Sequence, residues 1–257
     1  MVKAPAYVIL GRGRWAKRMQ PILAGEGRRV VNIEDTRQGQ SESQDTYISR
    51  LADAMKASSA QVAWLCVTPG PHVSLMVQAA FEPGLHVIVE KPWYGSTEDT
   101  WRLQSLANAR RRLIAVHFEY LAHPEVEKWK KTFYPGEELH FVGHFSLGRA
   151  DHLGVPAIDN LGCHLMAVHE FAVPSSTIVE LKCAYERSDE RCVWLEREGK
   201  RIASIDLLKG SERIIQDFMK KVEAALDGAS FPFDLDFALR VAGQLKAYGA
   251  RCSSQSA

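Results

Sequence analysis

Five short apolar runs divide the first half of the chain, at residues 7–10, 30–33, 62–67, 86–89 and 113–118. Their length and their content of valine, isoleucine and leucine are typical of strands that are buried on both faces. Segments in which apolar residues recur at helical spacing lie between these runs. Because strands and helices alternate, the pattern predicts a doubly wound parallel sheet with helices on both faces, an α/β fold.

Start and stop signals delimit the intervening helices. Residues 96–99, with the sequence Ser-Thr-Glu-Asp, form a capping box, and Pro71 stands where the preceding helix is expected to open. Residues 45–57 are expected to form another helix. Pro21 is expected to kink or shorten the first helix, because a proline inside a helix removes a backbone hydrogen bond and clashes with the preceding turn.

The pattern changes after about residue 120, and the second half predicts an α+β domain. Its expected elements, in chain order, are a helix, a strand, a helix, three strands and two helices, at residues 124–133, 139–147, 158–172, 178–185, 191–198, 201–208, 212–227 and 234–248. Short turns join the three consecutive strands, which predicts antiparallel pairing. The tail from residue 251 is expected to fray. We therefore expect a Rossmann domain at 1–121 and an α+β domain with a mostly antiparallel sheet at 122–257.

Composition narrows the classes of function. A net charge of +1 gives no reason to expect nucleic acid or an anionic membrane as a partner. No apolar run approaches the length of a membrane span, and the N-terminus lacks the features of a signal peptide. The five cysteines include no CxxC pair, and the histidines show no metal-ligand spacing. These features predict a cytoplasmic protein without a disulfide framework or metal site.

A glycine turn separates the first predicted strand from the first predicted helix. Its sequence, residues 11–16, is Gly-Arg-Gly-Arg-Trp-Ala, a GxGxxA pattern. In a dinucleotide-binding turn the first glycine permits the tight bend and the second lets the backbone approach a pyrophosphate. The small third residue allows close packing of helix and strand. Gly11, Gly13, Arg14, Trp15 and Ala16 are therefore candidate cofactor-binding residues, with the phosphates at the helix N-terminus.

The second predicted strand ends in two carboxylates, Glu34 and Asp35, a little over twenty residues after the glycine turn. An acid at this place binds the ribose hydroxyls of NAD. Asp35 is the preferred candidate and Glu34 the alternative. Because Arg37 and the arginines of the glycine turn can accommodate the additional phosphate of NADP, the sequence leaves NAD and NADP both open.

Three segments together resemble the Gfo/Idh/MocA family of oxidoreductases. They are GRGRWA at 11–16, VTPGPH at 67–72 and HVIVEKP at 86–92, and the resemblance covers about the first 125 residues. It implies an NAD(P)-dependent oxidoreductase. The EKP sequence is the most specific element, because in the family it follows a strand that lies beside the nicotinamide.

The resemblance also implies roles for single residues. Lys91 maps onto the family's catalytic or substrate-orienting lysine, and Glu90 onto a glutamate near the nicotinamide ribose and carboxamide. Pro92 follows a peptide bond that is often cis in the family. The loop that lines the cofactor maps onto Thr68, Pro69 and His72. These roles suit residues at the carboxyl ends of parallel strands, where ligands bind in an open α/β sheet.

A second motif lies in the predicted helix at 158–172. Residues 157–164, Ala-Ile-Asp-Asn-Leu-Gly-Cys-His, resemble a family segment in which an aspartate and a histidine four residues later share proton transfer. His164 maps onto that histidine. Asn160 stands at the aspartate's position and cannot act as a general base, whereas Asp159 is one residue early, about 100° around a helix. We keep Asp159, Asn160 and His164 as catalytic candidates.

The second domain departs from the family in two respects. Only about 85 residues follow the His164 helix, so the domain is expected to be shortened. The sheet that commonly supports oligomerisation in the family would then present a changed interface for a possible homo-oligomer. Residues 119–121, Glu-Tyr-Leu, replace the Asn-Arg-Arg-like residues that often follow the fifth strand, which suggests a different substrate.

Two functions are consistent with these observations. The first is hydride transfer between nicotinamide and a C–OH/C=O or C=N centre of a small polar molecule, either sugar-like or a natural-product intermediate. Lys91 would polarise the substrate and His164 would relay a proton. The alternative is a family member that has lost catalysis and acts as a nucleotide-sensing regulator or partner protein. Asn160 and the shortened domain favour the alternative, and the retained Lys91 and His164 favour the enzyme.

Overall fold

The computed structural model describes residues 4–148, 156–185, 189–211 and 213–255, which form two compact units. The first unit comprises the chain up to His117 together with Val222–Leu239, and the second comprises Phe118–Lys221 together with the chain from Arg240 onward. A single cut near residue 121 therefore differs from this division, because the first unit also includes a segment from the C-terminal part of the chain.

The first unit contains the predicted parallel sheet. Its strands are β1 (Tyr7–Leu10), β2 (Val30–Ile33), β3 (Val62–Leu65), β4 (His86–Val89) and β5 (Ile114–Val116). They pair in the order β2-β1-β3-β4-β5, and every neighbouring pair is parallel. The doubly wound α/β fold is thus confirmed for this unit.

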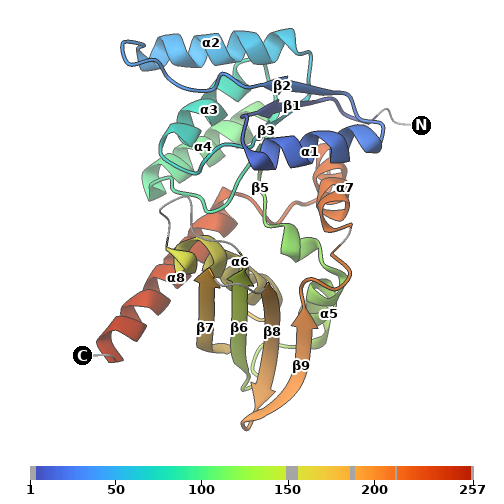
Figure 1. Ribbon diagram of the computed structural model, residues 1–257, viewed down its shortest axis with the longest axis vertical. Helices are drawn as coiled ribbons and strands as arrows, with labels where there is room; N and C mark the ends of the chain where they lie inside the picture. Colours follow the sequence, from blue (N-terminus) through green and yellow to red (C-terminus); the bar gives the residue numbers. More distant parts are fainter. Residues whose placement is uncertain (1–3, 149–155, 186–188, 212, 256–257) are drawn as a thin grey trace. The chain divides into compact units, whose positions relative to one another are not determined.

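Helices cover this sheet on both faces, as predicted. They are α1 (Arg14–Gly25), α2 (Gln44–Ala57), α3 (His72–Phe81) and α4 (Thr97–Arg110). The strand order and right-handed crossovers place α1 on one face and α2, α3 and α4 side by side on the other (Figure 1). The capping box is confirmed, since the Ser96 hydroxyl accepts a hydrogen bond from the Asp99 N–H at 3.0 Å.

Pro21 does not shorten the first helix, which was one of the two expected outcomes, and the other, a kink, stays a prediction. Helix α1 continues through Pro21 to Gly25. Met19 and Leu23, on either side of the proline, are both fully buried. Burial of these two side chains therefore outweighs the hydrogen bond that the proline cannot donate.

A buried ion pair joins residues 222–239 to the rest of the first unit. The guanidinium of Arg28, with 7% of its side chain exposed, donates two hydrogen bonds to Glu223, at 2.6 and 3.0 Å. The Tyr7 hydroxyl donates to the same carboxylate at 3.0 Å, and burial raises the pKa of Tyr7, as does Glu223. Farther along, the Phe233 carbonyl accepts from the Val116 N–H at 2.7 Å, beside the edge strand β5.

The second unit contains the α+β elements expected from the sequence. In chain order they are a 3-10 helix η1 (Glu119–Ala122), α5 (Pro124–Thr132), β6 (His140–Leu147), α6 (Ala157–Ala172), β7 (Thr177–Tyr185), β8 (Glu190–Arg197), β9 (Lys200–Asp206), α7 (Ile214–Leu226) and α8 (Leu235–Gln255). Helices α7 and α8 contribute residues to both units. The sheet order is β7-β6-β8-β9, and two of its three pairings are antiparallel.

Two expectations for this unit were wrong. β7 and β8 do not pair, because β6 lies between them and pairs with β7 in parallel. The segment β6-α6-β7 is a strand–helix–strand crossover, and such a crossover places its two strands parallel. The tail was expected to fray from residue 251, yet α8 continues to Gln255.

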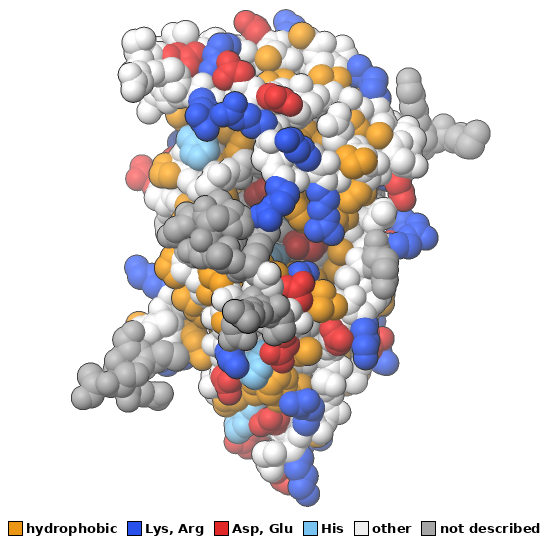
Figure 2. Space-filling model, in the orientation of Figure 1, with side chains coloured by type: hydrophobic (Ala, Val, Ile, Leu, Met, Phe, Trp, Pro, Cys, Tyr) orange, Lys and Arg blue, Asp and Glu red, His pale blue; other side chains and the backbone are white. Residues whose placement is uncertain are grey.

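Helix α6 packs against one face of the second sheet. No helix of the described residues covers the other face in Figure 1, and we call it the open face. Figure 2 shows hydrophobic, acidic and histidine side chains mixed on this open face over β6 and β8. There the His144 imidazole lies 3.0 Å from Glu180, and the Trp194 ring packs edge-on against it. None of the helices in the described parts of the chain is long and apolar enough to cross a membrane.

Candidate cofactor and active site

The carboxyl ends of the five parallel strands place most of the candidate residues along one edge of the first sheet. Gly11 follows β1, Asp35 follows β2, and Lys91 follows β4. The strand order reverses between β1 and β3, which is the position where open α/β sheets bind their ligands. The topology alone therefore directs attention to the glycine turn and the loops on either side of it.

Gly11 has a backbone conformation that requires glycine. Its φ is +127°, and a Cβ atom there would lie 2.4 Å from the Cys66 carbonyl oxygen at the end of β3. The Gly11 N–H donates to the Ile33 carbonyl at 2.8 Å, which joins the turn to β2. Gly11 therefore closes the bend between β1 and α1 at the point where three strands end.

Gly13 differs, because the structure itself does not require glycine there. Its φ of −70° is open to any residue, and a Cβ atom would meet nothing within 4 Å. No side chain caps the α1 N-terminus, no acidic residue lies in its first turn, and the small Ala16 is buried behind it. The space beside Gly13 and the N–H groups of α1 thus fit a pyrophosphate, so the glycine turn suits a dinucleotide.

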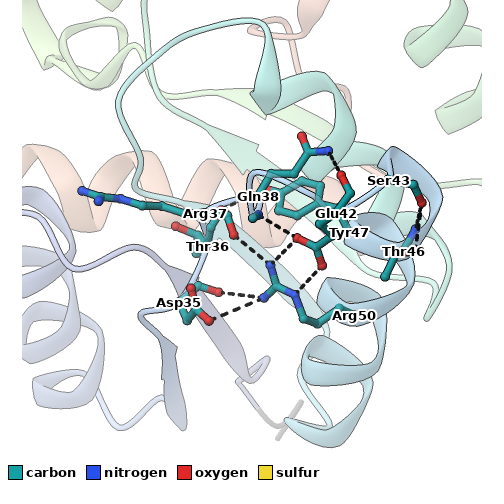
Figure 3. Close-up of polar contacts among 10 residues, drawn as sticks. Asp35, Thr36, Arg37, Gln38, Glu42, Ser43, Thr46, Tyr47 and Arg50 are labelled. Carbon is teal, nitrogen blue, oxygen red and sulfur yellow. Dashed lines mark hydrogen bonds and ion pairs between the residues drawn. The ribbon is translucent and has the colours of Figure 1, made fainter.

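The Asp35 carboxylate lies beyond β2, with 86% of its side chain exposed and one oxygen 3.8 Å from Arg50. Arg50, from α2, donates to both oxygens of Glu42, at 2.9 and 3.2 Å, and to the Arg37 carbonyl at 2.8 Å (Figure 3). These bonds hold the pKa of Glu42 below its usual value. One arginine thus orders the loop that presents Asp35.

Two further features of this loop bear on cofactor choice. The Tyr47 hydroxyl donates to the Thr36 carbonyl at 2.8 Å, which fixes the start of the loop on α2. In Figure 3 the Arg37 side chain extends away from the Arg50 cluster. Among the contacts drawn in Figure 3, none joins the Arg37 side chain to Asp35. The Asp35 carboxylate is exposed to solvent, where the ribose of a dinucleotide can reach it.

The remaining cofactor candidates lie in the loops after β3 and β4. Thr68 is exposed and Pro69 is half-buried in the loop after β3, and His72 is the first residue of α3. Lys91 is half-buried two residues after β4, and its bond to Pro92 is cis, as the family resemblance implied. These positions are those expected from the sequence, and the roles of the residues remain predictions.

Glu90 is the centre of a buried hydrogen-bond network that sequence reasoning missed. Its Oε1 accepts from the indole N–H of Trp15 at 2.6 Å and from that of Trp64 at 2.9 Å. The His117 Nδ1 lies 3.2 Å from the same oxygen, and the side chains of Glu90 and His117 are only 12% and 0% exposed. Glu90 therefore connects α1 to the ends of β3, β4 and β5.

The register of the strands explains this convergence. Trp64 on β3 pairs with Ile88, and Ile88 pairs with Ala115 on β5. Glu90 lies two residues after Ile88, and His117 lies two residues after Ala115. Both therefore point to the same face of the sheet as Trp64. A polar residue directly after each of two buried strands, Glu90 after β4 and His117 after β5, is the signal that sequence analysis could have used, once the register was known.

In the second unit, His164 lies on α6 with 4% of its side chain exposed. Asn160, one turn earlier, donates from its amide to the Tyr185 hydroxyl at 2.8 Å, and Asp159 is exposed. Glu119, from η1, has its carboxylate 3.9 Å from the His164 Nδ1. The sequence alone marks Glu119 only as a departure from the family, because nothing in it connects residues 119 and 164.

Comparisons with known proteins agree with this geometry. Residues 6–118 match the family model described as "Oxidoreductase family, NAD-binding Rossmann fold", GFO_IDH_MocA. A search of the curated proteins found none that matches the chain. Among solved structures, GenD2 from gentamicin A biosynthesis, in complex with NAD, has a TM-score of 0.74 at 16% identity, covering 96% of this chain and 93% of that one.

Two further structures have the same fold. UDP-N-acetylglucosamine 3-dehydrogenase GnnA from Acidithiobacillus ferrooxidans has a TM-score of 0.74 at 14% identity, covering 95% of this chain and 96% of that one. An inositol dehydrogenase homolog from Azotobacter vinelandii, complexed with NADH and myo-inositol, has a TM-score of 0.66 at 12% identity, covering 95% and 94%. The expected shortening of the second domain stays a prediction. Residues 6–118 of this chain thus match the NAD-binding Rossmann domain of the Gfo/Idh/MocA family of oxidoreductases.

Proposed function

We propose that the protein transfers a hydride between nicotinamide and a C–OH/C=O or C=N centre of a small polar substrate. The observation that carries the proposal is the position of Lys91, two residues after β4 in a domain that matches the NAD-binding family model. Bound NAD would supply or accept the hydride. The chain's own residues would bind the dinucleotide, orient the substrate and move one proton.

Each residue then has a distinct task. The helix N-terminus at Gly13 would bind the pyrophosphate and Asp35 the adenosine ribose. The ammonium group of Lys91 would donate a hydrogen bond to the reacting oxygen or nitrogen of the substrate and so polarise it. His164 would accept the proton of an alcohol during oxidation, or return it during reduction. Asn160 would not act as a base, because an amide does not titrate.

Sugar-like secondary alcohols are the first substrate class to test. The solved structures with the same fold include a UDP-N-acetylglucosamine dehydrogenase and a complex with myo-inositol, both concerned with ring alcohols. Natural-product intermediates with C=N bonds are the second class, since their reduction needs a proton donor more than a strong base. A nucleotide-linked sugar, myo-inositol, an aminoglycoside and a cyclic imine together sample both classes.

The test is steady-state turnover of these four compounds by wild-type protein and by Lys91→Ala, measured through nicotinamide absorbance. We expect Lys91→Ala to lower kcat by about 100-fold or more, the usual contribution of a positioned proton donor or acceptor, with NADH affinity largely retained. Lys56→Ala, which alters an exposed lysine in the last turn of α2, is the matched control and should keep full turnover. Near-normal kcat in Lys91→Ala would refute the role of Lys91.

NADH binding without turnover of any substrate would favour the alternative, a nucleotide-sensing regulator.

We also propose, from the family resemblance, that the open face of the second sheet mediates self-association. Light scattering after size-exclusion chromatography tests this, and a monomer at every concentration would contradict it.

A further inference from the structure

We propose that Glu119 is the positioning residue for His164, the carboxylate that holds this imidazole in a defined tautomer and favours its protonated form. The inference rests on the proposed function, because it assigns a partner to the histidine that moves the proton. It replaces the expectation that the partner is Asp159 or Asn160, the carboxylate and amide on the histidine's own helix.

The two side chains form a secluded pair within the second unit. The Glu119 Oε2 lies 3.9 Å from the His164 Nδ1, and the side chains are 12% and 4% exposed. Within the described residues this oxygen of Glu119 makes no hydrogen bond. A buried carboxylate oxygen without a donor is costly, and a nearby imidazolium offsets that cost. A small rotation of the glutamate would bring the 3.9 Å contact to hydrogen-bond distance.

The residues of α6 itself do not supply this charge. The Asn160 amide is bonded to the Tyr185 hydroxyl of β7, and an amide carries no charge at any ordinary pH. Asp159 is exposed in the first turn of α6, and one residue of displacement turns its side chain about 100° from the face of Asn160. Glu119, which η1 brings from 45 positions earlier in the chain, is the carboxylate at His164.

Among the described residues, two aromatic rings also pack against His164, and a cation lies beyond them. The Tyr120 ring of η1 packs edge-on at 5.0 Å between centroids, and the Phe145 ring of β6 packs at 5.2 Å. Arg191 of β8 donates to the Tyr120 hydroxyl and stacks over Phe145. The rings lower the local dielectric, which strengthens the attraction between the Glu119 carboxylate and a protonated His164. The positive charge of Arg191 disfavours that protonation.

This arrangement assigns different tasks to the two ring nitrogens. The Nδ1 faces Glu119 and carries a proton in the favoured tautomer, as it does where a carboxylate orients a histidine. Proton exchange with the substrate then falls to the Nε2. Loss of the carboxylate would release the tautomer and make the imidazole harder to protonate, while the α6 backbone stays in place.

The experiment is an NMR titration of His164 in protein labelled at the histidine ring carbons, without substrate. His164→Gln assigns the signal. We expect the midpoint of the His164 titration in Glu119→Gln to lie about 1 pH unit or more below that of the wild type, because an opposite charge this close shifts a titration by that amount. Glu119→Asp, which keeps the charge, should fall between the two. An unchanged midpoint in Glu119→Gln would overturn the inference.

Glu180→Gln is the matched control. It removes a carboxylate 3.0 Å from another histidine of the same unit, His144, on the open sheet face. The His164 midpoint should not change in this variant. A shift as large as that in Glu119→Gln would show a general charge effect and would also overturn the inference.

The titration separates this inference from the proposed function. If Lys91-dependent turnover is found and Glu119→Gln leaves the His164 midpoint unchanged, only the role of Glu119 fails. If the midpoint moves as expected and no substrate is turned over, the pairing stands and the proposed function fails. Once a substrate is known, the kcat–pH profile of Glu119→Gln should shift in the same direction as the NMR midpoint.

Discussion

Replacing Glu90 with alanine is expected to destabilise the first unit strongly. The substitution removes the acceptor for the indole N–H groups of Trp15 and Trp64, at 2.6 and 2.9 Å, and for the His117 ring at 3.2 Å. These donors come from α1, β3 and the end of β5, so the loss affects contacts between three elements. Glu90→Gln is the milder change, because the amide keeps one acceptor oxygen and loses the charge.

The magnitude follows from the geometry. A hydrogen bond to a charged group contributes about 1.5–3 kcal/mol net. The three donors share one carboxylate, so their contributions are not additive, and the 12% exposure of the side chain lets water replace part of the loss. We therefore expect Glu90→Ala to lower the free energy of unfolding by about 3–4 kcal/mol and Glu90→Gln by about 1–2 kcal/mol.

The assay is urea-induced unfolding followed by far-ultraviolet circular dichroism, which does not depend on the tryptophans being perturbed. Because the two compact units can unfold in separate transitions, both transitions are fitted. Glu82→Gln, which breaks an exposed ion pair with Arg110 on the same unit, is the control and should change stability by less than about 0.5 kcal/mol. A Glu90→Ala protein as stable as this control would refute the reasoning.

Three further predictions concern the same unit. Glu223→Ala should lower the free energy of unfolding by about 2–4 kcal/mol, because the buried Arg28 guanidinium loses its two bonds to Glu223 and keeps only Glu26, 3.2 Å away; a double variant, Arg28→Met with Glu223→Leu, should recover most of the loss in urea unfolding, and no recovery would contradict the ion-pair account. Asp35→Asn should weaken NADH binding about tenfold or more in a fluorescence titration and reduce the difference in affinity between NADH and NADPH. An unchanged difference in affinity would exclude Asp35 as the carboxylate that binds the ribose. Burial, with Arg112 nearby, lowers the pKa of His86 to about 4, below the ordinary value of 6.5; the neutral ring therefore stabilises the fold fully above pH 6.5, and this stability is lost as pH falls from 6.5 towards 4. His86→Gln should show a flatter stability–pH slope in that window, and an identical slope would contradict the assignment.

Local signals in the sequence were sufficient for most of the fold. Apolar runs placed all five strands of the first sheet, and the serine and aspartate at residues 96 and 99 placed the start of α4 through their capping bond. The conformation of Gly11 and the open space at Gly13 match what the GxGxxA pattern predicts. These features depend on residues that are neighbours in the chain, which is why the sequence alone could predict them.

The errors and omissions have a common physical cause, since they depend on contacts between distant segments. The short connection after β7 suggested a hairpin, whereas the β6-α6-β7 crossover decides the pairing. The ion pair of Arg28 and Glu223 joins residues 195 positions apart, so one cut in the chain could not represent the first unit. The proximity of Glu119 and His164 likewise depends on how η1 packs against α6.

The measurement that tests the central claim most directly is a titration of wild-type protein and Gly13→Val with NADH, followed by energy transfer from tryptophan to nicotinamide. A Cβ atom at Gly13 would meet nothing within 4 Å and the φ there is −70°, so we expect the variant to fold normally while its side chain occupies the place of the pyrophosphate. We predict saturable binding to the wild type with a dissociation constant on the order of micromolar and binding at least about tenfold weaker in Gly13→Val, with equal thermal stability of the two proteins. Failure of the wild type to bind either NADH or NADPH, or equal affinity in Gly13→Val, would contradict the account.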